Sequence, residues 1–154
     1  MKISYLALLI LFLTACGGGS NPQDATSETE GQSENDRRNQ LRLNQYTVKG
    51  KELYTTFCSA CHQLNGEGLA AQFPPLKGAD YLLEDLARAA CGIRNGQSGS
   101  IVVNGVEYNS VMPALPNLTD LEVAQIITYI TNDWGNSEGL SDVNTVSEWL
   151  ANCE

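Results

Sequence analysis

The sequence CSACH, residues 58–62, decides the fold, and it closes the longer stretch GKELYTTFCSACH, residues 50–62. The C-x-x-C-H spacing is the pattern of covalent haem attachment. Two thiols separated by a dipeptide can each add to a vinyl group on one haem edge, and the adjacent histidine then lies under the iron as its proximal ligand. The motif therefore predicts one covalent haem c, attached through Cys58 and Cys61 and ligated by His62.

Two other kinds of site can be built from paired cysteines, and neither matches this chain as well. A thioredoxin-like redox dithiol is expected beside a β-α-β pattern, which the surrounding sequence lacks. A structural zinc site needs about four nitrogen or sulfur ligands. The chain has a single histidine, and its other cysteines lie far from the motif. Haem attachment is therefore the favoured interpretation.

The second axial ligand follows by elimination. Methionine or a second histidine takes this position in electron-transfer haem proteins, and His62 is the chain's one histidine. The chain has two methionines, and Met1 lies in an N-terminal segment that is expected to be removed. Met112 is therefore the candidate. The alternative is that Met112 only fills the core, with the sixth position open or held by a lysine or tyrosine.

Residues 1–15 are typical of an export signal. Lys2 precedes an apolar run over residues 3–13, which is too short to span a bilayer as a mature helix. The run ends in LTAC, residues 13–16, which resembles the lipobox of bacterial lipoproteins. This resemblance implies a lipoprotein signal peptide over residues 1–15 and a lipid on Cys16. The alternative is an ordinary signal peptide with Cys16 merely nearby.

Residues 16–45 are expected to form a flexible tether, and residues 46–154 a folded domain with a C-terminal extension. The tether sequence is almost free of apolar residues, so it cannot bury enough surface to offset the entropy of ordering. Hydrophobic spacing in the folded part predicts a mostly α class with one short hairpin before the Met112 loop. The predicted elements are a helix capped by Thr47, a helix over residues 80–95, a hairpin turning at Asn104 and Gly105, a helix from the capping box Thr119–Glu122 to about Trp134, and a last helix over residues 142–150.

Cys91 and Cys153 are predicted to form a disulfide. The chain has five cysteines, and lipid and haem account for three of them, which leaves an even pair. An exported protein lies in a compartment where disulfides persist. Two alternatives are a buried free thiol at Cys91 and an intermolecular bridge between two copies of Cys153.

The flanking motifs resemble those of class I cytochromes c, from about Val48 to Gly135. The resemblance rests on GKELYTTFCSACH, NGEGLAAQFPPLKGADYL, VNGVEYNSVMPAL and LTDLEVAQIITYITNDWGN. It implies a fold in which N- and C-terminal helices cross and loops wrap one haem. It further implies that Met112 is the axial ligand, that the Pro74 carbonyl accepts a hydrogen bond from His62, and that Leu76 packs on the haem. Gly50 and Tyr129 match the residues at the helix crossing.

These features together predict a lipid-anchored one-electron carrier facing the periplasm, expected to be a monomer and not an enzyme. Its expected partners are redox proteins, namely a donor and a terminal acceptor complex. The formal net charge of −9 argues against nucleic acid as a partner, because a phosphate backbone needs basic contacts. One alternative is a haem-bearing subunit of an oxidase or dehydrogenase complex. Another is a haem enzyme or gas sensor, which would need the bond between iron and Met112 to be weak or absent.

Overall fold

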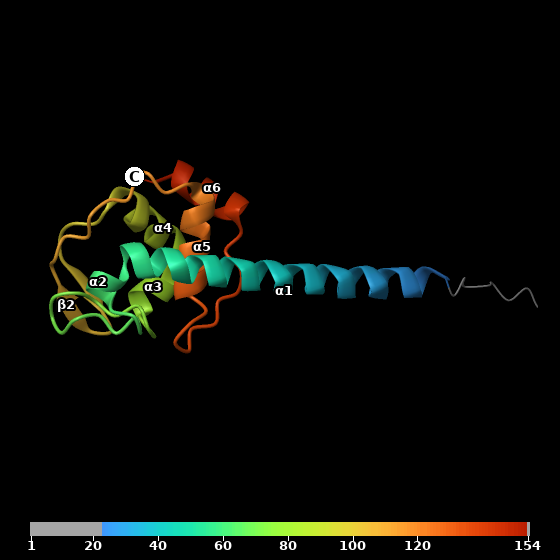
Figure 1. Cartoon of the computed structure of the whole chain (residues 1–154), viewed down its shortest axis with the longest axis horizontal. Coiled ribbons are helices and arrows are strands. Elements are labelled where there is room, and N and C mark those ends of the chain that lie inside the picture. Colours follow the sequence, from blue (N-terminus) through green and yellow to red (C-terminus); the bar gives the residue numbers. More distant parts are fainter. Residues whose placement is uncertain (1–22, 154) are drawn as a thin grey trace, which may run out of the picture. The chain divides into compact units, whose positions relative to one another are not determined.

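The computed structural model describes residues 23–153, with side chains described from residue 33 onward. Residues from Asn35 onward form one compact unit. Figure 1 shows its helices and one small hairpin. The elements are α1 (Gln23–Phe57), α2 (Ser59–His62), α3 (Asp80–Glu84), α4 (Leu86–Asn95), β1 (Ile101–Val103), β2 (Val106–Tyr108), α5 (Asp120–Ile130) and α6 (Val143–Ala151). Among the described residues, no helix is both long enough and apolar enough to cross a membrane.

The flexible tether predicted over residues 16–45 is wrong for residues 23–45, which belong to α1. Helix α1 therefore begins well before Thr47, while residues 1–22, including Cys16, lie outside the described residues. The segment contains no proline to stop a helix. Pairs four residues apart also support it, because Gln40 donates to Asn44 at 3.2 Å and the Arg42 guanidinium lies 5.9 Å from the centre of the Tyr46 ring. The prediction of a tether used the low hydrophobicity of the segment, which takes no account of such local side-chain pairs.

The crossing of α1 with α5 is the centre of the core. A Cβ atom at Gly50 would lie only 2.0 Å from the Gln125 carbonyl oxygen and 2.7 Å from the Tyr129 Cβ, so the two helices meet where α1 has no side chain. Next to this contact, the rings of Tyr54, Tyr129 and Trp134 pack with centroids 5.2–5.4 Å apart. Such tilted aromatic pairs add about 0.5–1.5 kcal/mol beyond the area they bury.

The single helix predicted over residues 80–95 is instead two helices, α3 and α4. Asp85 is extended, with φ −151° and ψ 93°, and its side chain accepts a hydrogen bond from the backbone N–H of Arg88 at 2.9 Å. An aspartate that caps the next helix ends the preceding one. Helix α4 therefore begins at Leu86 and is free to take its own direction.

The predicted hairpin is confirmed. Strands β1 and β2 pair antiparallel with Ile101 opposite Tyr108, and the turn residues Asn104 and Gly105 both have positive φ, 50° and 78°. Two such residues make the type I′ turn that matches the twist of a hairpin. The segment that follows carries Met112.

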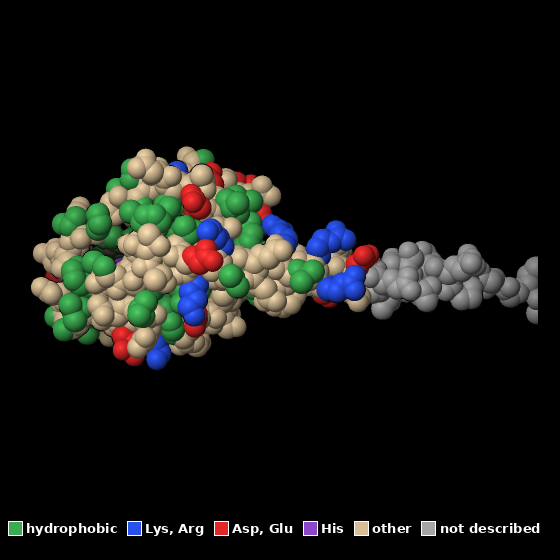
Figure 2. Space-filling view, viewed as in Figure 1, with side chains coloured by type: hydrophobic (Ala, Val, Ile, Leu, Met, Phe, Trp, Pro, Cys, Tyr) green, Lys and Arg blue, Asp and Glu red, His purple; other side chains and the backbone are tan. Residues whose placement is uncertain are grey.

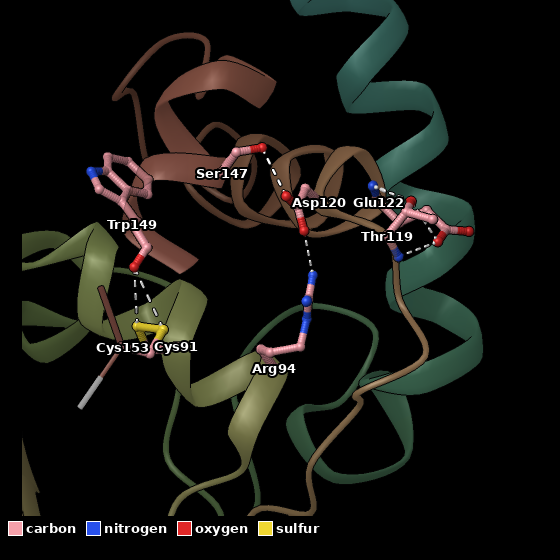
Figure 3. A network of polar contacts seen from close by, with 8 residues as sticks. All are labelled: Cys91, Arg94, Thr119, Asp120, Glu122, Ser147, Trp149 and Cys153. Atoms are coloured by element: carbon pink, nitrogen blue, oxygen red, sulfur yellow. Dashed lines mark hydrogen bonds and ion pairs between the residues drawn. A yellow bond between two sulfur atoms is a disulfide. The ribbon is translucent and has the colours of Figure 1, made fainter. Parts of the chain in front are cut away.

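Helix α5 has the predicted capping box, in which Thr119 accepts from the Glu122 N–H at 3.3 Å and the Glu122 carboxylate accepts from the Thr119 N–H at 2.8 Å. The helix ends at Ile130 rather than near Trp134. After it, α6 packs against α4 and α5 (Figure 1). Cys91 and Cys153 form the disulfide predicted from the cysteine count, with Cα atoms 5.6 Å apart (Figure 3).

Candidate haem-binding site

A largely apolar cavity of about 670 Å³, its open mouth included, lies between the loop after α2, helices α3 to α5, and the hairpin. Apolar walls with a few convergent polar groups are the usual form of a cofactor site. Cys58, His62 and Met112, which are far apart in the sequence, all line it. Its apolar wall includes Pro74, Pro75, Leu76, Leu82, Ile93, Ile101, Val103, Ile126 and Ile130. Figure 2 shows hydrophobic side chains gathered at the end of the molecule that carries α2 and β2.

His62 is held in one tautomer. It is the last residue of α2 and is buried, and its Nδ1 lies 3.0 Å from the carbonyl oxygen of Pro74. A carbonyl can only accept, so Nδ1 carries the proton and Nε2 keeps its lone pair. Burial lowers the pKa of His62, an effect that the hydrogen bond to Pro74 opposes. The side chain is therefore a neutral imidazole with a free nitrogen, which is the form that binds metals.

The two thiols of the motif stand at the start of α2 and within it, since Cys58 is the N-cap residue and Cys61 is the third residue of the helix. Cys58 is buried and lines the main cavity, and burial raises the pKa of its thiol to about 12. Cys61 is half-buried and lines a second cavity beside the first. Both are free thiols, so neither is used for a disulfide. His62 and Met112 line both cavities, so the two cysteines lie on neighbouring cavities that share these residues.

Met112 is positioned through its backbone. Its N–H donates to the Gln97 carbonyl and its own carbonyl accepts from the Gln97 N–H, both at 2.9 Å. The side chain is half-buried and lines the cavity. A thioether sulfur on the same cavity as an imidazole nitrogen is the donor pair of an electron-transfer haem iron.

The residues present match a haem better than a bare metal ion. Among the described residues, no group of three or more histidine, cysteine, aspartate or glutamate side chains could hold a metal ion. The two neighbouring cavities together offer one nitrogen, one thioether and two thiols within largely apolar walls. A flat apolar macrocycle that brings four nitrogen ligands of its own suits this set.

Sequence reasoning missed two polar residues of the wall. Tyr81 and Gln97 line the cavity, and the Gln97 amide donates to the Tyr81 hydroxyl at 3.1 Å. The guanidinium of Arg88 lies over the Tyr81 ring, 3.8 Å from its centroid. No spacing or composition signal marked Gln97, because it stands in a loop of glycine and serine whose partner, Met112, is fifteen residues away.

Comparison with known proteins agrees with this geometry. Residues 47–134 match the family model described as cytochrome c. The chain is 36% identical over 93 residues to a cytochrome c-552 of Thermus thermophilus, a match covering 58% of this chain and 70% of that protein. A second Thermus cytochrome c-552 is equally similar, over 62% of its length.

A more distant relative is larger. The cytochrome c subunit of a quinone-dependent alcohol dehydrogenase of Gluconobacter oxydans is 30% identical over 91 residues, which cover 57% of this chain and only 19% of that subunit. The family model itself covers the part of this chain from within α1 to just after α5. The chain belongs to the cytochrome c family, with the class I fold, and is an electron-transfer protein whose haem c is covalently bound.

Proposed function

We propose that this chain is a lipid-anchored cytochrome c with one haem, which carries single electrons on the periplasmic side of a bacterial membrane. The observation that carries the proposal is the convergence of Cys58, His62 and Met112 on one apolar cavity. Cys58 and Cys61 would attach the haem, His62 Nε2 and the Met112 sulfur would bind the iron, and Leu76 would pack on the ring. When bound, the haem supplies an iron that accepts and releases one electron.

The protein's own contribution is positioning and exclusion. The Pro74 carbonyl fixes the orientation of His62 and raises its basicity as a ligand. With His62 and Met112 both bound to the iron, small ligands would be kept out, which would favour electron transfer over oxygen or peroxide chemistry. The apolar walls keep water from the site and so help to set its reduction potential.

Replacing Met112 by Ala tests the assignment of the sixth ligand. The wild-type oxidised protein should show the weak sulfur-to-iron absorption band in the far red, and the variant should lose this band and have a lower reduction potential. Val102→Ala is the control, because Val102 is an exposed apolar side chain that lines neither cavity. A wild-type spectrum without the band would reject Met112 as ligand. Haem that resists extraction by acidified acetone would support attachment through Cys58 and Cys61.

The anchor is proposed from the sequence alone, since residues 1–22 lie outside the described residues. An apolar run that ends in Ala15-Cys16 supports lipid attachment at Cys16. Replacing Cys16 by Ser should leave a soluble or an unprocessed protein with an unchanged haem spectrum. A processed variant that still sediments with membranes would show that the anchor lies elsewhere.

A second candidate is a haem-bearing subunit of a membrane dehydrogenase or oxidase. The similarity to cytochrome subunits of alcohol dehydrogenases supports it, although the matched region is a fifth of those subunits or less. Gentle extraction from membranes separates the two cases, because a carrier purifies alone and a subunit purifies with fixed partners.

The net charge of −9 predicts that a carrier uses a basic partner surface, so the rates of electron transfer to that partner should fall as the salt concentration rises.

A further inference from the structure

The loop that carries Met112 is fastened to the C-terminal end of α4. Gln97 and Met112 exchange two backbone hydrogen bonds of 2.9 Å, and the Leu115 N–H donates to the carbonyl of Ile93 at 3.1 Å. Ile93 lies in the last turn of α4, where carbonyls have no partner within the helix. The loop therefore satisfies the helix end, and any movement of that end moves Met112.

The end of α4 and the Met112 loop are packed so closely that no side chain fits between them. Gly96, the residue that caps α4, has φ +78°, and a Cβ atom there would lie 2.8 Å from the Met112 carbonyl oxygen and 2.9 Å from the Ala114 nitrogen. Glycine is the residue that tolerates both this conformation and this approach. The backbone at the end of α4 therefore contacts the backbone of the Met112 loop directly and sets its position.

Helix α4 is in turn tied from its other side to the C-terminal segment, residues 135–153, which follows the region matched by the family model. The disulfide joins Cys91 of α4 to Cys153, just after α6 (Figure 3). Both sulfurs lie near the carbonyl oxygen of Trp149, at 3.8 and 3.6 Å, as contacts rather than hydrogen bonds because a disulfide has no proton to donate.

A polar network makes the second tie. Arg94 in the last turn of α4 donates to one oxygen of Asp120 at 2.8 Å, and Ser147 of α6 donates to the other at 2.8 Å (Figure 3). Asp120 is the first residue of α5, where the helix dipole favours an anion, and Arg94 stands where it favours a cation. One carboxylate thus joins three helices.

The C-terminal segment is itself well fixed, as a support must be. The Ser141 N–H donates to the Thr128 hydroxyl at 3.1 Å, and Asn132 exchanges bonds of 2.7 and 2.8 Å with the backbone of Gly139. Val146 of α6 is fully buried. The segment is therefore part of the core rather than a loose tail.

We propose that the C-terminal segment is a brace that positions Met112. It fixes α4 through Cys91–Cys153 and through Asp120, and α4 carries the backbone of Met112. Cys91, Cys153 and Asp120 are positioning residues, since none of them lines the cavity. The inference rests on the proposed role of Met112 as an axial ligand, and it predicts that loss of the brace loosens Met112 before the domain unfolds.

Native-state hydrogen exchange of the haem-containing protein tests the brace. The double variant Cys91→Ser with Cys153→Ser should raise the denaturant-independent exchange rates of the Gln97 and Met112 amides by at least about tenfold, because that rate reports local opening. Leu53→Ala is the control, since it weakens the core at a buried side chain of α1 and leaves α4 and the loop intact. In Leu53→Ala, the amides of Gln97 and Met112 should exchange at the wild-type rate. Asp120→Asn should give a smaller change in the same direction as the double variant.

The outcomes separate the brace from general stabilisation and from the ligand assignment. Unchanged loop rates in the double variant, or an equal rise in Leu53→Ala, would overturn the brace. If the double variant fails to fold, the same rates are measured on wild-type protein with its disulfide reduced by a phosphine, against protein kept ferrous by ascorbate with the disulfide intact. A wild-type protein without the far-red sulfur band would reject Met112 as ligand, whatever the exchange rates show.

Discussion

The two faces of α4 are held in different ways. One face, formed by Ala89, Gly92 and Ile93 at helical spacing, lines the apolar cavity. The other face presents Arg88 and Cys91 to a groove shared with α6, and it is held by the disulfide and, one turn later, by the ion pair of Arg94. The stability of the cavity face depends on the group bound in the cavity. The stability of the far face depends on the disulfide and the ion pair within the chain. The fold thus separates support by the cofactor from support by its own cross-links.

Removing the cofactor's attachment should have the largest effect. In the double variant Cys58→Ser with Cys61→Ser, no covalent haem can form, so no haem is permanently fixed in the apolar cavity. The loss should approach the whole stability of a small domain, about 5–15 kcal/mol. Haem staining after denaturing electrophoresis and thermal melting by circular dichroism measure it. Ser59→Ala in the same motif should keep both haem and melting. A haem-free double variant that melts cooperatively at the wild-type temperature would refute the dependence of this face on haem.

Removing the disulfide should have the next largest effect, and it tests the far face. Cys91 and Cys153 are 62 residues apart, so the chain-entropy model gives roughly 4 kcal/mol for the bridge. The double serine variant should unfold in urea at a correspondingly lower midpoint while the haem stays covalently attached. A shift below about 1 kcal/mol would mean that the polar network and the buried face of α6 already hold α4 without the bridge.

Gly96→Ala changes the residue that ends α4, where the helix meets the Met112 loop. The added methyl group meets the Met112 carbonyl and must adopt a left-handed backbone, so the cost should be about 2–4 kcal/mol. Gly99→Ala is a matched control, because Gly99 has φ +93° with no atom within 4 Å of its added Cβ. It should cost only the conformational part, about 1 kcal/mol. Equal unfolding midpoints for the two variants would mean that the loop can shift away from α4.

The elements of this fold that rest on local signals were predictable from the sequence. The hairpin at Asn104 and Gly105 and the capping box of Thr119 and Glu122 use only neighbouring residues, and both are confirmed. The division at Asp85 was missed, since a capping aspartate inside an apolar pattern resembles an exposed helical residue. The start of α1 was also missed, because low hydrophobicity hid its local side-chain pairs, and because the ion pair of Arg42 with Asp142 joins residues a hundred positions apart.

The same distinction applies to the candidate site. The residues with distinctive chemistry, namely Cys58, His62 and Met112, could be named in advance because their residue types are rare in this chain. The brace could not, apart from its disulfide. Arg94, Asp120 and Ser147 are ordinary surface residue types whose meeting depends on how three helices pack. Gln97 holds Met112 through its backbone, and this contact leaves no signal in the identity of its side chain.

The smallest expected effect is that of the ion pair on the far face, and it depends on pH. The hydrogen bond from Arg94 is the main cause that lowers the pKa of Asp120, helped by Ser147. Since the folded pKa lies below the unfolded value of about 3.9, the pair stabilises the fold at higher pH, and this stability is lost as pH falls through the folded pKa. Asp120 is partly exposed, so solvent screening limits the contribution of the ion pair to less than about 1 kcal/mol.

The urea midpoints of wild type and Asp120→Asn should therefore differ near neutral pH and converge in acid, and added salt should reduce the difference. Glu84→Gln removes the same charge from an exposed position at the end of α3 and serves as the control. A difference between Asp120→Asn and wild type that persists unchanged into acid would show that hydrogen-bond geometry, rather than charge, makes Asp120 the junction of the three helices.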